Sequence, residues 1–97
     1  MTTTESEIAE NFRRIGQLVT ARWPKATAKV TDSAFAGPGI LLEHPVNDLA
    51  VVLLDGTWEL IVQHPYDRDW ILVCDLGEPA DLARATVNAI EESELYA

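Results

Sequence analysis

The sequence has 97 residues, of which 47% are hydrophobic and 24% are charged, and its formal net charge is −9. This length fits one domain, and the apolar content excludes an intrinsically disordered chain. No apolar run reaches the roughly 18 residues that a membrane-spanning helix needs, so we expect no association with a membrane.

Helical periodicity predicts a first helix over about residues 5–22. Thr4 and Glu7 have the spacing of a capping box, in which the two side chains cap the helix start reciprocally. Trp23 precedes Pro24 and is therefore disfavoured in the α conformation, which ends the helix. The expected buried stripe is Ile8, Phe12, Ile15 and Val19.

The middle of the chain changes to the period of two that is typical of strands. The expected strands are residues 28–31, 40–43, 49–54, 57–63 and 70–76, with a turn at Gly37-Pro38-Gly39. Asp55-Gly56 lies between two apolar runs and predicts a two-residue hairpin with a type I′ turn. That hairpin pairs Leu54 with Thr57, Leu53 with Trp58, Val51 with Leu60 and Leu49 with Val62. Short loops between consecutive strands predict an antiparallel meander.

A second helix is expected after Gly77, with Pro79 in its first turn and Glu78 and Asp81 favouring its N-terminal dipole. Its apolar stripe is Leu82, Ala83, Val87 and Ile90, and we expect fraying from about Ser93. The predicted fold class is α+β: a five-stranded antiparallel β-meander with N- and C-terminal helices packed on one face. Residues 5–97 form this single domain after a flexible N-terminus, residues 1–4.

Strand alternation predicts a second apolar surface on the sheet face opposite the helices. With Asp75 turned to solvent, Trp70, Leu72, Cys74 and Leu76 are expected to face the core. The outer face then carries an aliphatic cluster, which usually marks an interaction surface. Alternatively, a helix covers this face, or β propensity alone selects these residues. The interface candidates are Val52, Leu54, Ile61, Ile71 and Val73, together with Trp23 as an anchor at the end of the first helix.

Two His-Pro segments follow the second and fourth predicted strands, and a meander places both at one end of the sheet. Two imidazoles and nearby carboxylates suit zinc binding or acid–base chemistry. However, the third strand separates their strands by roughly 9.5 Å, and His-Pro is also a common strand-ending turn. The weak candidates for a site at this rim are His44, His64, Asp67 and Tyr66.

The sequence contains no nucleotide-binding glycine motif, no His-x-x-x-His pair and no nucleophile elbow. We therefore expect no catalytic residues, no cofactor and no metal, and we expect Cys74 to be an unreactive buried thiol. Its single cysteine cannot form an internal disulfide and no signal peptide is visible, so we expect a cytoplasmic protein.

Residues 32–97 carry a net charge of −11 and residues 1–31 carry +2. Such a balance disfavours direct nucleic-acid binding. The leading hypothesis is a small acidic, non-catalytic interaction module, of the accessory, inhibitor or immunity type, that binds a protein partner or itself as a homodimer. The alternatives are a small-molecule binder or enzyme with a site near His44 and His64, and an inhibitor that mimics nucleic acid.

Overall fold

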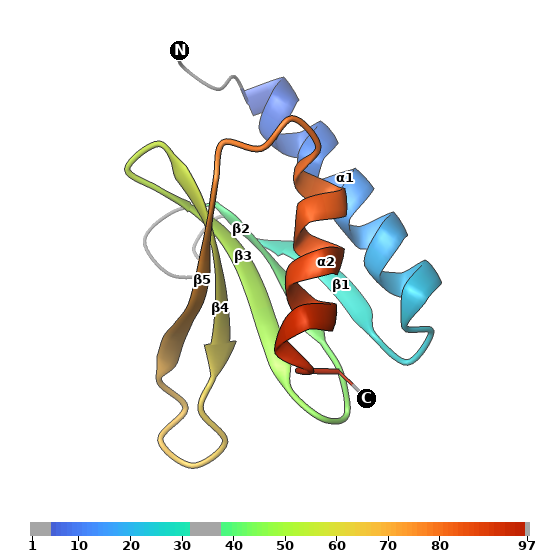
Figure 1. Ribbon diagram of the computed structural model, residues 1–97, viewed down its shortest axis with the longest axis vertical. Helices are drawn as coiled ribbons and strands as arrows, with labels where there is room; N and C mark the ends of the chain where they lie inside the picture. The colour runs from blue at the N-terminus through green and yellow to red at the C-terminus, as the bar shows by residue number, and fades with distance from the viewer. Residues whose placement is uncertain (1–4, 32–37, 97) are drawn as a thin grey trace.

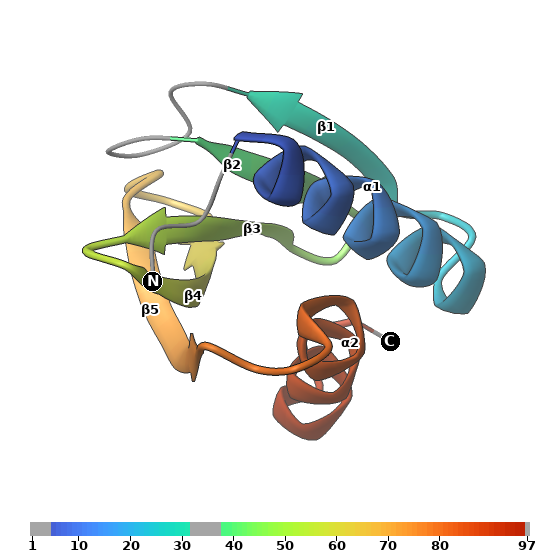
Figure 2. The ribbon, with the colours of Figure 1, turned by 90° about the horizontal axis from the view of Figure 1, so that it is seen from above.

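Two helices flank a five-stranded sheet in a computed structural model that describes residues 5–31 and 38–96. The strands are antiparallel and follow one another across the sheet in the order β1-β2-β3-β4-β5. Both helices lie on the same side of the sheet, which curves around them (Figures 1 and 2). The α+β meander expected from the sequence is therefore confirmed. The elements are α1 (Glu5–Arg22), β1 (Thr27–Thr31), β2 (Gly39–Glu43), β3 (Asp48–Leu54), β4 (Thr57–Gln63), β5 (Trp70–Gly77) and α2 (Leu82–Ser93).

Helix α1 packs its predicted apolar stripe against the sheet. Phe12, Ile15 and Val19 are buried, and the helix approaches β1 closely at Gly16. A Cβ atom at Gly16 would lie only 3.2 Å from the Cβ of Ala28, so a larger residue here would require β1 or the helix to shift slightly. The helix ends at Arg22 as predicted. The predicted capping residue Thr4, the expected flexible end 1–4 and Gly37 of the predicted turn lie outside the described residues.

The β3–β4 hairpin has the predicted register. Leu54 pairs with Thr57 and Val51 pairs with Leu60. Asp55 and Gly56 both have positive φ, 50° and 83°, as a type I′ turn requires. The two-residue loop therefore sets which side chains of β3 and β4 face the helices.

The β4–β5 pairing departs from a regular ladder at two places. Leu60 pairs with Cys74 but its neighbour Ile61 pairs with Leu72, which leaves Val73 as an extra residue in β5. A second shift lies between Trp58 and Glu59. Because an extra residue reverses the facing of everything beyond it, the first part of β5 is turned over relative to the prediction.

Helix α2 begins at Leu82 rather than near Pro79, because the carboxylate of Asp81 caps it. The Asp81 side chain accepts a hydrogen bond from the backbone N–H of Arg84 and contacts the guanidinium of Arg14 in α1 at 3.2 Å. The Arg84 N–H and, after it, Arg14 lower the pKa of Asp81. The prediction that Pro79 lies in the first helical turn is wrong, because the helix starts three residues later, directly after the Asp81 cap.

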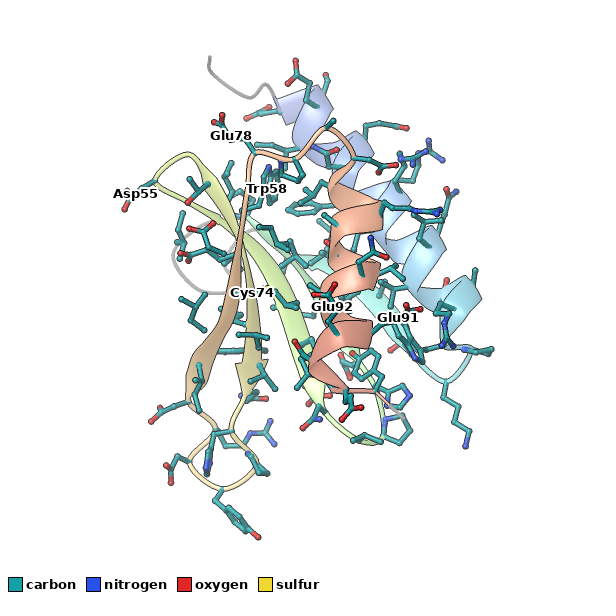
Figure 3. The ribbon with its side chains drawn as sticks, viewed as in Figure 1. Asp55, Trp58, Cys74, Glu78, Glu91 and Glu92 are labelled. Carbon is teal, nitrogen blue, oxygen red and sulfur yellow. The ribbon has the colours of Figure 1, made fainter. Side chains whose placement is uncertain are left out.

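The core lies between the helices and the inner face of the sheet. Trp58 extends from β4 into this space (Figure 3), where its ring meets Phe12 of α1 edge-on, with 5.5 Å between centroids. At the other end of the core, Trp23 meets Tyr96 edge-on at 5.4 Å. The chain reaches Tyr96 because Glu94 adopts a left-handed conformation that ends α2.

Candidate functional site

The outer sheet face is not the open aliphatic surface that alternation predicted. Val52 is 1% exposed and Ile61 is 4% exposed, and with Ala50 they form a second, smaller cluster. Leu54 and Trp70 pack against this cluster. Two of the interface candidates are therefore interior residues. The bulge in β5 turns the Trp70 side chain onto this face instead of into the main core, and Trp70 packs against the same cluster.

The remaining two sheet candidates also change place. Val73 packs against the main core instead of the outer cluster, and Ile71 pairs with Val62 of the helix-facing side. Leu72, which was expected in the core, stands opposite Ile61 and is 55% exposed. Cys74 and Leu76 pack against the main core as predicted. These exchanges follow from the one extra residue at Val73.

The largest uncovered aliphatic side chains of the sheet now lie on β5. Ile71 is 48% exposed and Leu72 is 55% exposed, and they are adjacent in a strand at the border of the sheet (Figure 1). Among the described residues, no strand pairs with β5 on the side away from β4. Backbone N–H and C=O groups on such an edge are available to another strand.

The two sheet edges differ in how they discourage pairing. β1 has five residues and includes Lys29, and a lysine on an edge strand opposes the docking of another strand. β5 has eight residues, no lysine or proline, and Asp75 as its one charged residue. The two bulges in β5 still oppose pairing with another strand, because they twist β5 away from a flat geometry.

Carboxylates surround this edge. Residues 67–78 contain four acidic residues and one arginine, a net charge of −3. Asp75 is paired across the sheet with Glu59, so two carboxylates occupy directly opposite positions, an arrangement that disfavours the pair. Glu92 lies on the side of α2 toward β5 (Figure 3) and, together with Asp75, adds to the negative field at Cys74.

That field and, above all, burial raise the pKa of the Cys74 thiol. A raised thiol pKa keeps the sulfur protonated and weakly nucleophilic at neutral pH. The half-buried Cys74 is thus a packing residue in this site.

Each His-Pro segment forms a turn in which the histidine Nδ1 accepts backbone hydrogen bonds, and both turns lie at the end of the sheet where β5 begins. His44 Nδ1 accepts a hydrogen bond from the N–H of Val46 at 3.1 Å. His64 Nδ1 accepts from the N–H groups of Tyr66 at 3.2 Å and Asp67 at 3.1 Å. A ring nitrogen that accepts these bonds carries no proton, so each neutral imidazole holds its proton on Nε2. The Asp67 carboxylate lies 3.8 Å from the same His64 Nδ1.

The two His-Pro turns line one cleft of about 210 Å³. Gln63 and Arg68 contribute to it, whereas the predicted rim residues Asp67 and Tyr66 do not line it. Sequence reasoning missed Arg68, which adopts a positive φ of 64°. Its backbone N–H donates to the carbonyl of His64 at 3.0 Å, a geometry that no residue pattern in this loop indicates.

Trp23 is a core residue and not an exposed anchor. It is 5% exposed, with Tyr96 edge-on against it and the Arg22 guanidinium 5.1 Å from its ring centroid. Tyr96 also stacks on His44 at 4.1 Å and donates its hydroxyl to the carbonyl of Leu42. Trp23 is buried because the chain after α2 brings Tyr96 against it, a contact between distant residues that helical periodicity does not indicate.

Within residues 5–31 and 38–96, no group of three or more His, Cys, Asp or Glu side chains is arranged to hold a metal ion. No helix in that part of the chain combines the length and apolarity required to cross a membrane. Comparisons of the chain with protein-family models, curated proteins and solved structures gave no match.

Proposed function

We propose that this protein is a non-catalytic interaction module that binds another protein through the β5 edge. The observation that carries the proposal is the pair Ile71 and Leu72, about half exposed on an edge strand that is free on its outer side in the described structure. Adjacent aliphatic side chains at a border are favourable to bury, at roughly 25 cal/mol per Å² of apolar surface. The raised pKa of Cys74 is consistent with a surface that binds without reacting.

The experiment is affinity capture from the native host followed by reconstitution. Wild-type protein is compared with Leu72→Lys, and Val30→Lys serves as the matched control because Val30 is 56% exposed on the opposite edge strand. A captured protein is purified, and its binding to each variant is measured by titration. The proposal predicts that the wild type forms a direct complex with the purified partner and that Val30→Lys still forms this complex. Absence of any direct partner for the wild type in these titrations would remove the interaction function.

A second candidate function, binding of a small anion, is favoured by the cleft between the two His-Pro turns. His44 and His64 each keep an Nε2 N–H as a donor, and the cleft lining contains one cationic side chain, Arg68, and one carboxylate, Asp48. Such donors suit a phosphate or carboxylate group. Titration with inorganic phosphate, followed through the histidine ring signals in NMR spectra, tests this candidate. Saturable shifts that Arg68→Gln abolishes support it, and unchanged spectra reject it.

A further inference from the structure

The geometry points to strand addition as the way in which this edge is used: an extended, basic segment of the partner protein pairs with residues 70–73 of β5. This inference rests on the proposed interaction function and names the chemistry of its partner. Main-chain hydrogen bonds to an open edge supply affinity in such complexes, and side chains at alternate positions supply specificity. The argument has three steps, which concern the available backbone, the side-chain pattern and the choice of occupant.

The available backbone lies in the first half of β5. Helix α2 contacts β5 and covers its second half, where Cys74 and Leu76 pack against the main core. Ile71 and Leu72, by contrast, keep about half of their surface exposed. A partner strand therefore has access to the segment before the bulge at Val73, where the β4 pairing of Trp70, Ile71 and Leu72 is still regular.

The side-chain pattern specifies what the partner presents. On the outer face, an apolar side chain in the added strand would pack against Leu72. Further along the same face, Asp75 stands next to Glu59, and a lysine or arginine in the added strand would offset the repulsion of these two carboxylates. Asp67 and Asp69 extend the negative charge past the start of β5, where both are exposed. A segment fits this pattern when one face carries an apolar residue and, two positions further along, a basic residue.

A second copy of the chain fits it less well. Each copy carries a net charge of −9, and two β5 strands placed side by side would bring two carboxylate-rich borders together. Both strands would also carry the same two bulges, which disrupt a continuous ladder between rigid edges. A flexible peptide follows a twisted, bulged strand without that restriction.

The test uses the whole protein and a capped synthetic peptide of about seven residues, a usual strand length. Its sequence, Val-Val-Lys-Lys-Val-Val-Lys, makes valine and lysine follow one another along each face of the strand. Binding is measured by fluorescence anisotropy, and the contact is located by backbone NMR shifts. We expect shifts centred on residues 70–73 and a loss of affinity of roughly tenfold or more in Leu72→Lys. Val30→Lys adds the same charge on the other edge and should retain wild-type affinity. Asp75→Asn should weaken binding and reduce its dependence on salt.

Two peptide controls separate strand pairing from general attraction to an acidic protein. The first replaces lysine by glutamate and should not bind. The second carries N-methyl groups at every second residue, which remove the N–H donors of one edge but keep the charge, and it should also lose binding. Equal affinity for the N-methylated peptide would overturn strand addition.

Three other outcomes would each refute the inferred basic segment or its binding at β5. If light scattering shows that the wild type is a dimer and Leu72→Lys a monomer, the inferred basic segment is refuted. The occupant of the β5 edge is then a second copy of the chain. A purified natural partner whose binding survives Leu72→Lys would leave the interaction function standing but refute the β5 mode. Failure of the peptide to bind refutes the inference without touching a partner that binds elsewhere.

Discussion

Substitutions of Tyr96 measure how much the segment after α2 contributes to the stability of the domain. Tyr96→Phe removes the hydroxyl that donates to the carbonyl of Leu42 and should lower the free energy of unfolding by about 1 kcal/mol. Tyr96→Ala also removes the edge-on contact with Trp23 and the stack on His44. Aromatic truncation in a core costs about 3–5 kcal/mol, and clefts of about 340 and 410 Å³ beside the ring admit water to the space. We therefore expect the lower end, about 3 kcal/mol.

Urea denaturation followed by tryptophan fluorescence measures both changes, since Trp23 touches the altered ring. A loss of 1 kcal/mol corresponds to a fall of about 4–8 °C in the melting temperature of a domain of this size. Tyr66→Ala is the control, because Tyr66 is 87% exposed and its loss should stay within about 0.5 kcal/mol. If Tyr96→Ala unfolds at the same urea concentration as Tyr66→Ala, the packing argument is refuted.

The same tyrosine predicts how stability depends on alkaline pH. Burial and, to a smaller degree, Asp48 raise the pKa of Tyr96 in the folded chain. A group whose folded pKa is raised stabilises the fold fully below its unfolded pKa and less as pH rises above it. The wild type should therefore lose stability above about pH 10, the ordinary tyrosine pKa, and Tyr96→Phe should lose less. Parallel pH profiles for the two proteins would contradict this assignment.

Three further outcomes are expected. Gly56→Val should destabilise the domain by about 1–2 kcal/mol, because φ is +83° there although the space is open; an unchanged denaturation midpoint would contradict the type I′ turn. Ile61→Lys should unfold the chain or lower its melting temperature sharply, whereas Leu72→Lys should not, because these opposite residues are 4% and 55% exposed; equal effects would argue against the bulge. Purified protein should carry no stoichiometric zinc, and a chelator should leave its melting temperature unchanged; about one metal per chain, lost in a His44→Ala His64→Ala variant, would reverse this expectation.

Local sequence patterns predicted the fold because the turn residues, the strand alternation and the loop lengths all agree with one topology. The Asp55-Gly56 turn fixes a register, and the alternation on both sides of it agrees with that register at every pair. Short loops then leave a meander as the simple topology. Trp23 before Pro24 also ends α1 at the expected place.

The candidate site could not be predicted in the same way, because it depends on one extra residue in β5. No glycine or proline marks the bulge at Val73; its neighbours are Leu72 and Cys74. The bulge becomes favourable only when the rest of the sheet is present, since it lets Trp70 pack on the outer cluster while Val73 packs on the main core. Both contacts join residues that are distant in the sequence, so they are tertiary effects that local patterns do not carry.

This choice also determines where the protein can bind. In a regular ladder, Ile71 and Val73 would extend the Ile61 cluster across the middle of the outer face, and a partner would have to match a broad sheet surface. With the bulge, Trp70 packs against that cluster, and the uncovered aliphatic pair moves to a border where backbone groups are also available. A border offers directional hydrogen bonds as well as apolar contact. The same residue that made the sequence misleading about the outer face is therefore the physical reason to look for a partner strand at β5.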